Sequence, residues 1–152
     1  MDKIVKSDVF GVFKFNSDHM AYEHNGRKIK WILKLEKERD DVNKLIFKAE
    51  KLFKDLGKFD KIAKRSIAVE LIDFKNDFWP EYDENDEELD WDAVDAGEYE
   101  VTIEKFEGLI SLYFIEVRSN FIYCEYYDGD LFGGHRIHAS FDYSYNLINA
   151  EL

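Results

Sequence analysis

The residues best placed to do chemistry lie in one stretch, Asp-Gly-Asp-Leu-Phe-Gly-Gly-His, which runs from Asp128 to His135. A histidine that follows a glycine turn beside aspartates can have its tautomer fixed and its pKa raised by a carboxylate, as general acid–base catalysis requires. If the chain is an enzyme, His135 with Asp130 is the catalytic pair that we expect. No nucleophile accompanies the pair, because the GxSxG pattern is absent and Ser140 lies in an ordinary strand pattern.

The same stretch also fits a purely structural role. Glycine adopts positive φ readily, so Gly129, Gly133 and Gly134 suit a hairpin turn with a bulge. Neither the GxGxxG nor the Walker spacing is present, so the sequence predicts no phosphate cradle.

We expect no metal ion and no cofactor. His135 and His138 would lie on opposite faces of a strand, so they could not chelate one ion, and Cys124 is the only thiol. A pattern that resembles an EF-hand loop starts at Asp83, but it lacks the glycine at the sixth position and the glutamate at the twelfth.

The charge of the chain is concentrated in one segment. Residues 81–100 hold eleven Asp/Glu and no Lys/Arg, whereas residues 27–65 carry a net charge of +7, within a total of −12. Such an acidic segment repels nucleic acid and steers a basic protein partner, and its aromatic residues could anchor that partner. The partner-binding residues that we expect are Glu87, Glu88, Asp90, Trp91, Asp92 and Tyr99. The alternative is a solvated connection whose charge only aids solubility.

Length and composition predict a single domain over residues 1–152, with an acidic connecting segment at 81–100. The hydrophobic content of 45% excludes intrinsic disorder for most of the chain, and no apolar run is long enough to cross a membrane. The first residues, MDKIVKSD, lack the apolar region of a signal peptide, and the single Cys124 fits a reducing compartment. We therefore expect a cytoplasmic protein with no contact to nucleic acid or membrane.

The first third of the sequence predicts a three-stranded antiparallel meander. Residues 9–15 are rich in strand formers, residues 19–24 form a weaker strand, and residues 27–35 alternate between apolar and lysine positions. The Asn-Gly pair at 25–26 is a hairpin signal between the last two strands.

The middle of the chain changes to a helical period. Apolar residues repeat at helical spacing over 42–56 and again over about 60–76, which predicts two amphipathic helices. The residues that suit their ends are Asp40 or Asp41 as the first N-cap, Gly57 as the first stop, and Asp60 as the second N-cap.

After the acidic segment, a short helix capped by Thr102 precedes four strands, over 113–117, 121–127, 135–142 and 147–151. Strand 121–127 has Tyr123 and Glu125 on one face and Cys124 on the other, so one face should be core and the other should display aromatics. Because the strands cluster at both ends of the chain, the predicted fold class is α+β. A mainly antiparallel sheet forms from the N- and C-terminal strands, with two to three central helices packed on one face.

Several of these features together resemble a known family. They are the Asp128–His135 stretch, the Asn149–Glu151 ending, Phe10-Gly11 near the start, Asn25-Gly26 and the paired central helices. Over residues 9–151 the chain resembles the bacterial domain-of-unknown-function family 2262, whose Gly-His pair corresponds to Gly134 and His135. The resemblance implies an α+β fold and a bacterial, cytoplasmic setting, and it implies no activity. The acidic segment is less typical of the family, so any role for it is specific to this chain.

Three functional hypotheses follow. The first is a non-enzymatic module that binds a basic protein, in the manner of toxin-neutralising immunity proteins, with Trp91 and Tyr99 as anchors. The second is an enzyme or small-ligand-binding protein centred on the turn at His135. The third is a structural subunit that forms a homodimer through an edge strand or an aromatic sheet face.

Overall fold

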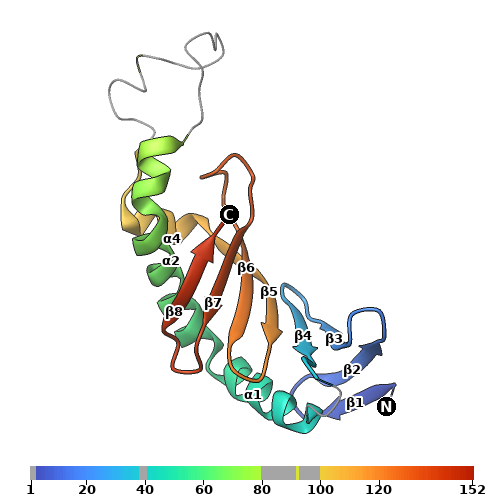
Figure 1. Ribbon diagram of the computed structural model, residues 1–152. Coiled ribbons are helices and arrows are strands. Elements are labelled where there is room, and N and C mark those ends of the chain that lie inside the picture. Colours follow the sequence, from blue (N-terminus) through green and yellow to red (C-terminus); the bar gives the residue numbers. More distant parts are fainter. Residues whose placement is uncertain (1–2, 38–40, 80–91, 93–99) are drawn as a thin grey trace.

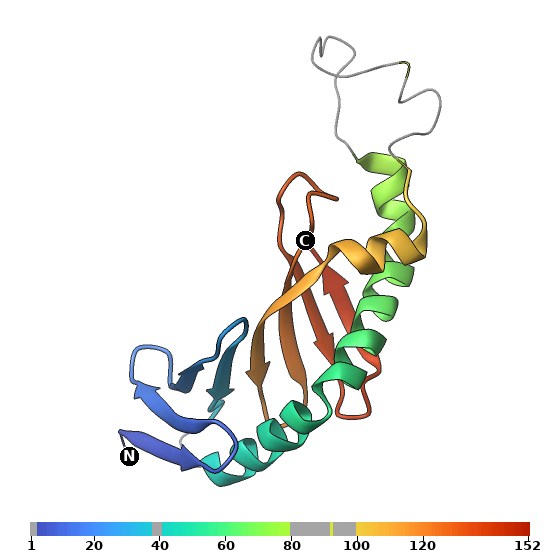
Figure 2. The ribbon, with the colours of Figure 1, turned by 180° about the vertical axis from the view of Figure 1, so that it is seen from behind.

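The computed structural model describes residues 3–37, 41–79, 92 and 100–152. Its strands form one eight-stranded sheet, and its helices cover one face of that sheet (Figures 1 and 2). The strands are β1 (Ile4–Ser7), β2 (Gly11–Asn16), β3 (Ala21–Asn25), β4 (Lys30–Lys34), β5 (Ser111–Val117), β6 (Ile122–Tyr127), β7 (Ile137–Phe141) and β8 (Leu147–Glu151). The helices are α1 (Val42–Lys54), α2 (Leu56–Phe78) and α4 (Ile103–Leu109). The predicted α+β class is therefore confirmed.

The strands follow one another across the sheet in sequence order, β1 to β8. All neighbouring pairs are antiparallel except β4 and β5, which run parallel with Trp31 opposite Ile115. A parallel pair needs a long crossover, because the chain must return to the starting end of the sheet. The helices lie within that crossover, which explains why they pack on a single face.

The N-terminal meander has one strand more than the sequence indicated. The predicted strands over 9–15, 19–24 and 27–35 correspond to β2, β3 and β4. The additional strand β1 pairs with β2, from Ile4 opposite Lys14 to Ser7 opposite Gly11. It was missed because four residues, Ile-Val-Lys-Ser, are too short to show a period.

The two long helices form as predicted, but the junction between them differs. The Asp41 side chain caps α1 by accepting a hydrogen bond from the Asn43 amide at 2.9 Å. Gly57 does not end α1, because α2 starts at Leu56 and Gly57 lies in its first turn. Asp60 is not an N-cap either. It lies inside α2, where its carboxylate accepts a hydrogen bond from the Tyr126 hydroxyl at 2.8 Å.

The core lies between the helices and the facing side of the sheet. On β6, Ile122, Cys124 and Tyr126 are fully buried and face the helices. The alternating residues of β6 therefore lie on the outer face of the sheet, which none of the described helices covers (Figures 1 and 2). The short helix α4 starts at Thr102, whose hydroxyl accepts a hydrogen bond from the Lys105 amide, as predicted. No helix in the described ranges is long and apolar enough to cross a membrane.

Candidate functional site

The turn between β6 and β7 is organised by Asp128. Its carboxylate accepts hydrogen bonds from the amides of Asp130 at 2.9 Å, Phe132 at 3.0 Å and Gly134 at 3.0 Å. Asp128 is only 5% exposed. A buried carboxylate must be hydrogen-bonded, and three convergent amides provide those bonds here. Sequence reasoning missed this role, although an Asp that bonds the amide two residues ahead is a known turn signal.

The glycines of this turn have positive φ, as a bulged turn requires. At Gly129 the requirement is also steric, because a Cβ there would lie 2.3 Å from the Leu109 carbonyl oxygen. The turn is therefore packed closely against the C-terminal end of α4.

The expected catalytic pair, His135 and Asp130, lies on the exposed side of the turn. Among the described residues no hydrogen bond joins the two side chains. The Asp130 backbone has φ 66°, and its amide donates to Asp128. The His135 ring instead contacts the Trp79 ring edge-to-face, with centroids 5.5 Å apart.

The contact with Trp79 brings the turn to the end of α2, where the chain leaves toward the acidic segment. The Trp79 ring also packs on Phe132, with centroids 5.9 Å apart. Beside it, the Lys75 ammonium group donates a hydrogen bond to the Trp79 carbonyl oxygen at 3.2 Å. Lys75 is buried, and desolvation lowers the pKa of its amine, although Glu100 acts in the opposite direction. The turn at Asp128–His135 therefore lies against Trp79, the residue that ends α2.

A pair of hydrogen bonds closes the base of the acidic segment. The Asn76 side chain donates to the Val101 carbonyl oxygen at 3.1 Å and accepts from the Val101 amide at 2.9 Å. The point where the chain leaves α2 is thus fixed next to the point where it returns to α4. Of the expected partner-binding residues, Asp92 is exposed. The others lie outside the described residues: Glu87, Glu88, Asp90, Trp91 and Tyr99.

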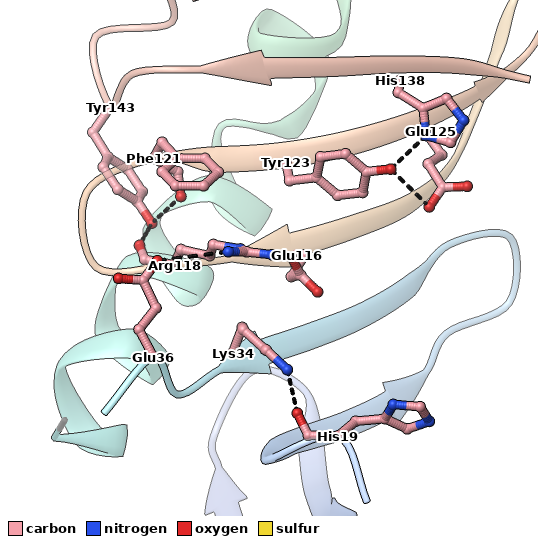
Figure 3. A network of polar contacts seen from close by, with 10 residues as sticks. All are labelled: His19, Lys34, Glu36, Glu116, Arg118, Phe121, Tyr123, Glu125, His138 and Tyr143. Carbon is pink, nitrogen blue, oxygen red and sulfur yellow. Dashed lines mark hydrogen bonds and ion pairs between the residues drawn. The ribbon is translucent and has the colours of Figure 1, made fainter. Parts of the chain in front are cut away.

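The outer face of the sheet holds a second group of polar side chains, which Figure 3 shows from close by. Glu125 accepts hydrogen bonds from the hydroxyls of Tyr113 at 2.7 Å and Tyr123 at 3.2 Å. The Tyr123 hydroxyl also lies 2.5 Å from Nδ1 of His138, which is opposite Glu125 in the sheet. Burial, followed by contact with the Glu125 carboxylate, raises the pKa of both tyrosines. Both are therefore neutral hydrogen-bond donors at physiological pH.

Aromatic and basic groups extend this outer face. Tyr113 stacks on Tyr127 with centroids 4.2 Å apart, and the Arg136 guanidinium lies over both rings at 5.1 and 5.9 Å. Toward the other end of the strands, Arg118 pairs with Glu116 at 2.7 Å (Figure 3). Tyrosine and arginine side chains of this kind are enriched where proteins bind one another. The prediction that the face of β6 opposite Cys124 displays aromatics is correct.

No group of three or more His, Cys, Asp or Glu side chains in the described ranges is placed to hold a metal ion. In the same part of the chain Cys124 is fully buried, and burial raises the pKa of its thiol, so this cysteine is an inert core residue.

Comparison with known proteins identifies the family. The sequence profile of the family described as "Uncharacterized protein conserved in bacteria (DUF2262)" matches residues 7–152. No curated protein and no solved structure gives a significant match. The match includes the described β2 to β8 strands, all three described helices and the turn at Asp128. The chain therefore belongs to the uncharacterised bacterial family DUF2262.

Proposed function

We propose that the chain is a non-enzymatic protein-binding module that captures a basic protein partner through the acidic segment at residues 81–100. The observation that carries the proposal is the pair of hydrogen bonds between Asn76 and Val101, which joins two residues that flank this segment in the sequence. Binding residues are commonly carried on segments that a rigid scaffold positions. The segment can thus engage a partner while the sheet and helices keep their arrangement.

The charge of the segment favours a basic partner. Its eleven carboxylates lie within twenty residues, without a single lysine or arginine. Such a density attracts a basic surface over the Debye length, about 8 Å at physiological ionic strength, and accelerates the encounter. Association should therefore weaken steeply as salt is added.

Exposed aromatic residues at the end of α2 would supply apolar anchors beside these charges. Phe78 is 61% exposed and Phe74 is 43% exposed, and their ring centroids lie 5.3 Å apart. Large aromatic side chains that become desolvated on binding commonly dominate the binding energy. In the proposed complex the acidic residues steer, and Trp91, Tyr99 and these phenylalanines anchor.

The test starts with the immobilised chain, which is used to capture partners from a lysate of its native cells at low and at high salt. The affinity of the purified partner is then measured. We expect a basic protein to bind at low salt, and Trp91→Ala to weaken binding at least tenfold. A variant in which Glu87 and Glu88 are replaced by glutamine, and Asp90 and Asp92 by asparagine, should no longer bind the partner. The matched control makes the same acid-to-amide replacements at four exposed positions elsewhere and should still bind the partner. These positions are Asp18, Glu70, Asp73 and Glu151.

Three outcomes would contradict the proposal: binding that does not change with salt, an unaltered affinity in Trp91→Ala, or an equal loss in the control variant. In the last case net charge, rather than this segment, would account for the attraction. Size-exclusion chromatography with mass determination of the isolated chain detects a homodimer, which would favour the structural-subunit hypothesis instead.

We also propose, as a second candidate, a small-ligand site at the turn around His135. It is supported by the exposed His135 ring, which rests on Trp79, and by the exposed Asp130 in the same turn. The test is to follow the His135 ring signals by NMR during titration with metabolite mixtures. A ligand that shifts them in the parent, and binds neither His135→Ala nor Asp130→Asn, supports the site. Shifts that survive in both variants would exclude it.

A further inference from the structure

A cavity of about 450 Å³ lies between α1 and the turn that joins β7 to β8. It is at the opposite end of α2 from Phe78, so it is separate from the turn around His135, which packs on Trp79 (Figure 1). Its volume is within the range of about 300–1,000 Å³ that is usual for small-molecule sites. The lining residues that matter for recognition are Lys44, Phe47, Lys48, Lys51, Tyr143 and Tyr145.

The floor of this cavity is aromatic. The Tyr143 hydroxyl donates to the carbonyl oxygens of Arg118 and Phe121, and Figure 3 shows it turned toward that backbone. The Tyr145 hydroxyl donates to the Asp55 carboxylate at 2.8 Å. Because both hydroxyls are already bonded to the protein, the two side chains offer the cavity their rings rather than their polar tips.

The outer wall of the cavity is Phe47, whose side chain is 63% exposed. An aromatic residue on the solvent side of a helix contributes little to folding, because it buries little surface against the core. Beside a cavity lined by two further rings, the same residue can cover an apolar ligand. The exposure of Phe47 is thus explained by a ligand better than by the fold.

The rim of the cavity is basic. Lys44, Lys48 and Lys51 follow at intervals of four and three residues, which places them on one face of α1. None of the three forms an ion pair within the described part of the chain. The Lys48 ammonium group lies 4.1 Å from the centre of the Tyr143 ring, so a positive charge is held directly above the aromatic floor. Three neighbouring like charges repel one another, and an anion placed among them would relieve that repulsion.

We propose that this cavity binds a small amphipathic carboxylate. The apolar body of the ligand lies against the rings of Phe47, Tyr143 and Tyr145, and its carboxylate accepts charge-assisted hydrogen bonds from the lysine amines at the rim. The proposal does not depend on the acidic segment or on a protein partner.

The test is isothermal titration calorimetry of the full chain with two carboxylates, decanoate for an aliphatic body and 2-naphthoate for an aromatic one. We expect at least one of them to bind with a stoichiometry of one and with affinity that falls as salt is added. The neutral analogues decanol and 2-naphthol should bind at least tenfold more weakly than the matching carboxylate. The comparison between the two acids reports which kind of body the cavity prefers.

Matched variants locate the site. Lys48→Gln combined with Lys51→Gln should weaken binding about tenfold, and Phe47→Ala about fivefold. The control is Lys58→Gln combined with Lys61→Gln, which removes the same charge from exposed positions on α2 and should leave the affinity within twofold. Phe47, Lys51, Lys58 and Lys61 are exposed and Lys48 is half-buried, so circular dichroism of each variant must first match that of the parent.

The proposal is overturned if neither acid binds, if the neutral analogues bind as tightly as the acids, or if the control pair weakens binding as much as the rim pair. It is also overturned if Phe47→Ala leaves the affinity unchanged, because the apolar body would then lie elsewhere. Failure of this test leaves the acidic segment unaffected, since residues 81–100 remain unchanged in each variant.

Discussion

Replacing Asp128 by asparagine should lower the free energy of unfolding strongly, although it changes only one carboxylate oxygen into an amide nitrogen. The Oδ1 of Asp128 accepts a hydrogen bond from the Asp130 amide, and its Oδ2 accepts hydrogen bonds from the Phe132 and Gly134 amides. An asparagine side chain has only one acceptor oxygen, so its amide nitrogen must face at least one backbone N–H. The charge that strengthens the remaining bonds is also lost.

The magnitude follows from these contacts. A hydrogen bond to a charged group contributes about 1.5–3 kcal/mol, and a buried donor without a partner costs about 1–3 kcal/mol. Phe132 is fully buried, whereas Asp130 and Gly134 are exposed, so water can replace the lost partner only at the latter two. Since neighbouring bonds do not add, we expect Asp128→Asn to lower the free energy of unfolding by about 2–4 kcal/mol.

Urea unfolding followed by far-ultraviolet circular dichroism measures this loss. The control is Asp130→Asn, two residues away, where the side chain is exposed and asparagine tolerates the positive φ of 66°. It should change the free energy of unfolding by less than about 0.5 kcal/mol, as surface substitutions commonly do. The reasoning is refuted if Asp128→Asn is as stable as the parent, or if the two variants lose equal stability.

Three further outcomes are expected. Tyr126→Phe removes the hydrogen bond to Asp60 and should cost about 1 kcal/mol in urea unfolding, whereas Tyr127→Phe, half exposed on the outer face, should cost almost nothing. Burial, together with the Asp55 carboxylate, raises the pKa of Tyr145 to about 12, and burial raises those of other tyrosines. As pH rises, tyrosines ionise in the unfolded chain before they ionise in the folded protein. The free energy of unfolding should therefore fall as pH rises above about 10. A tyrosinate absorbance titration in which every tyrosine of the native protein ionises near pH 10 would contradict this. The buried Cys124 thiol should react with a thiol reagent only through opening of the fold, so its rate should rise steeply with urea, and rapid labelling of the native protein would show the burial to be wrong.

Local sequence patterns predicted every described helix and strand except β1, whereas the pairing and packing of these elements depend on contacts between distant residues. The helical period and the Asp41 cap placed α1 correctly, because both signals lie within a few residues. Asp60 looked like an N-cap for the same kind of reason. Its actual partner, the Tyr126 hydroxyl, is 66 residues away, and no local pattern encodes that distance. The parallel pairing of β4 with β5 was likewise invisible, since each strand alone is compatible with either direction.

The candidate sites were predictable in part for the same reason. The glycines of the turn indicated positive φ correctly, and the alternation in β6 separated the outer residue Glu125 from the buried Cys124. The contact of His135 with Trp79 depends on how α2 packs against the sheet, so no local pattern could predict it. The spacing of Lys44, Lys48 and Lys51 is readable in the sequence and places them on one face of a helix, but the aromatic floor beneath them comes from the β7–β8 turn, about 90 residues later.

The order of strands has a consequence for how the chain folds. Six of the seven neighbouring strand pairs in the described sheet are joined by hairpins or short connections, and these local pairs lose little entropy when they close. Among the described strand pairs, β4 with β5, where Trp31 lies opposite Ile115, is the one that joins distant parts of the chain. The two groups of strands can therefore form independently, and the closure of β4 on β5 becomes the slow step that topology imposes. Substitutions along that one seam should change the folding rate more than substitutions of equal cost elsewhere in the sheet.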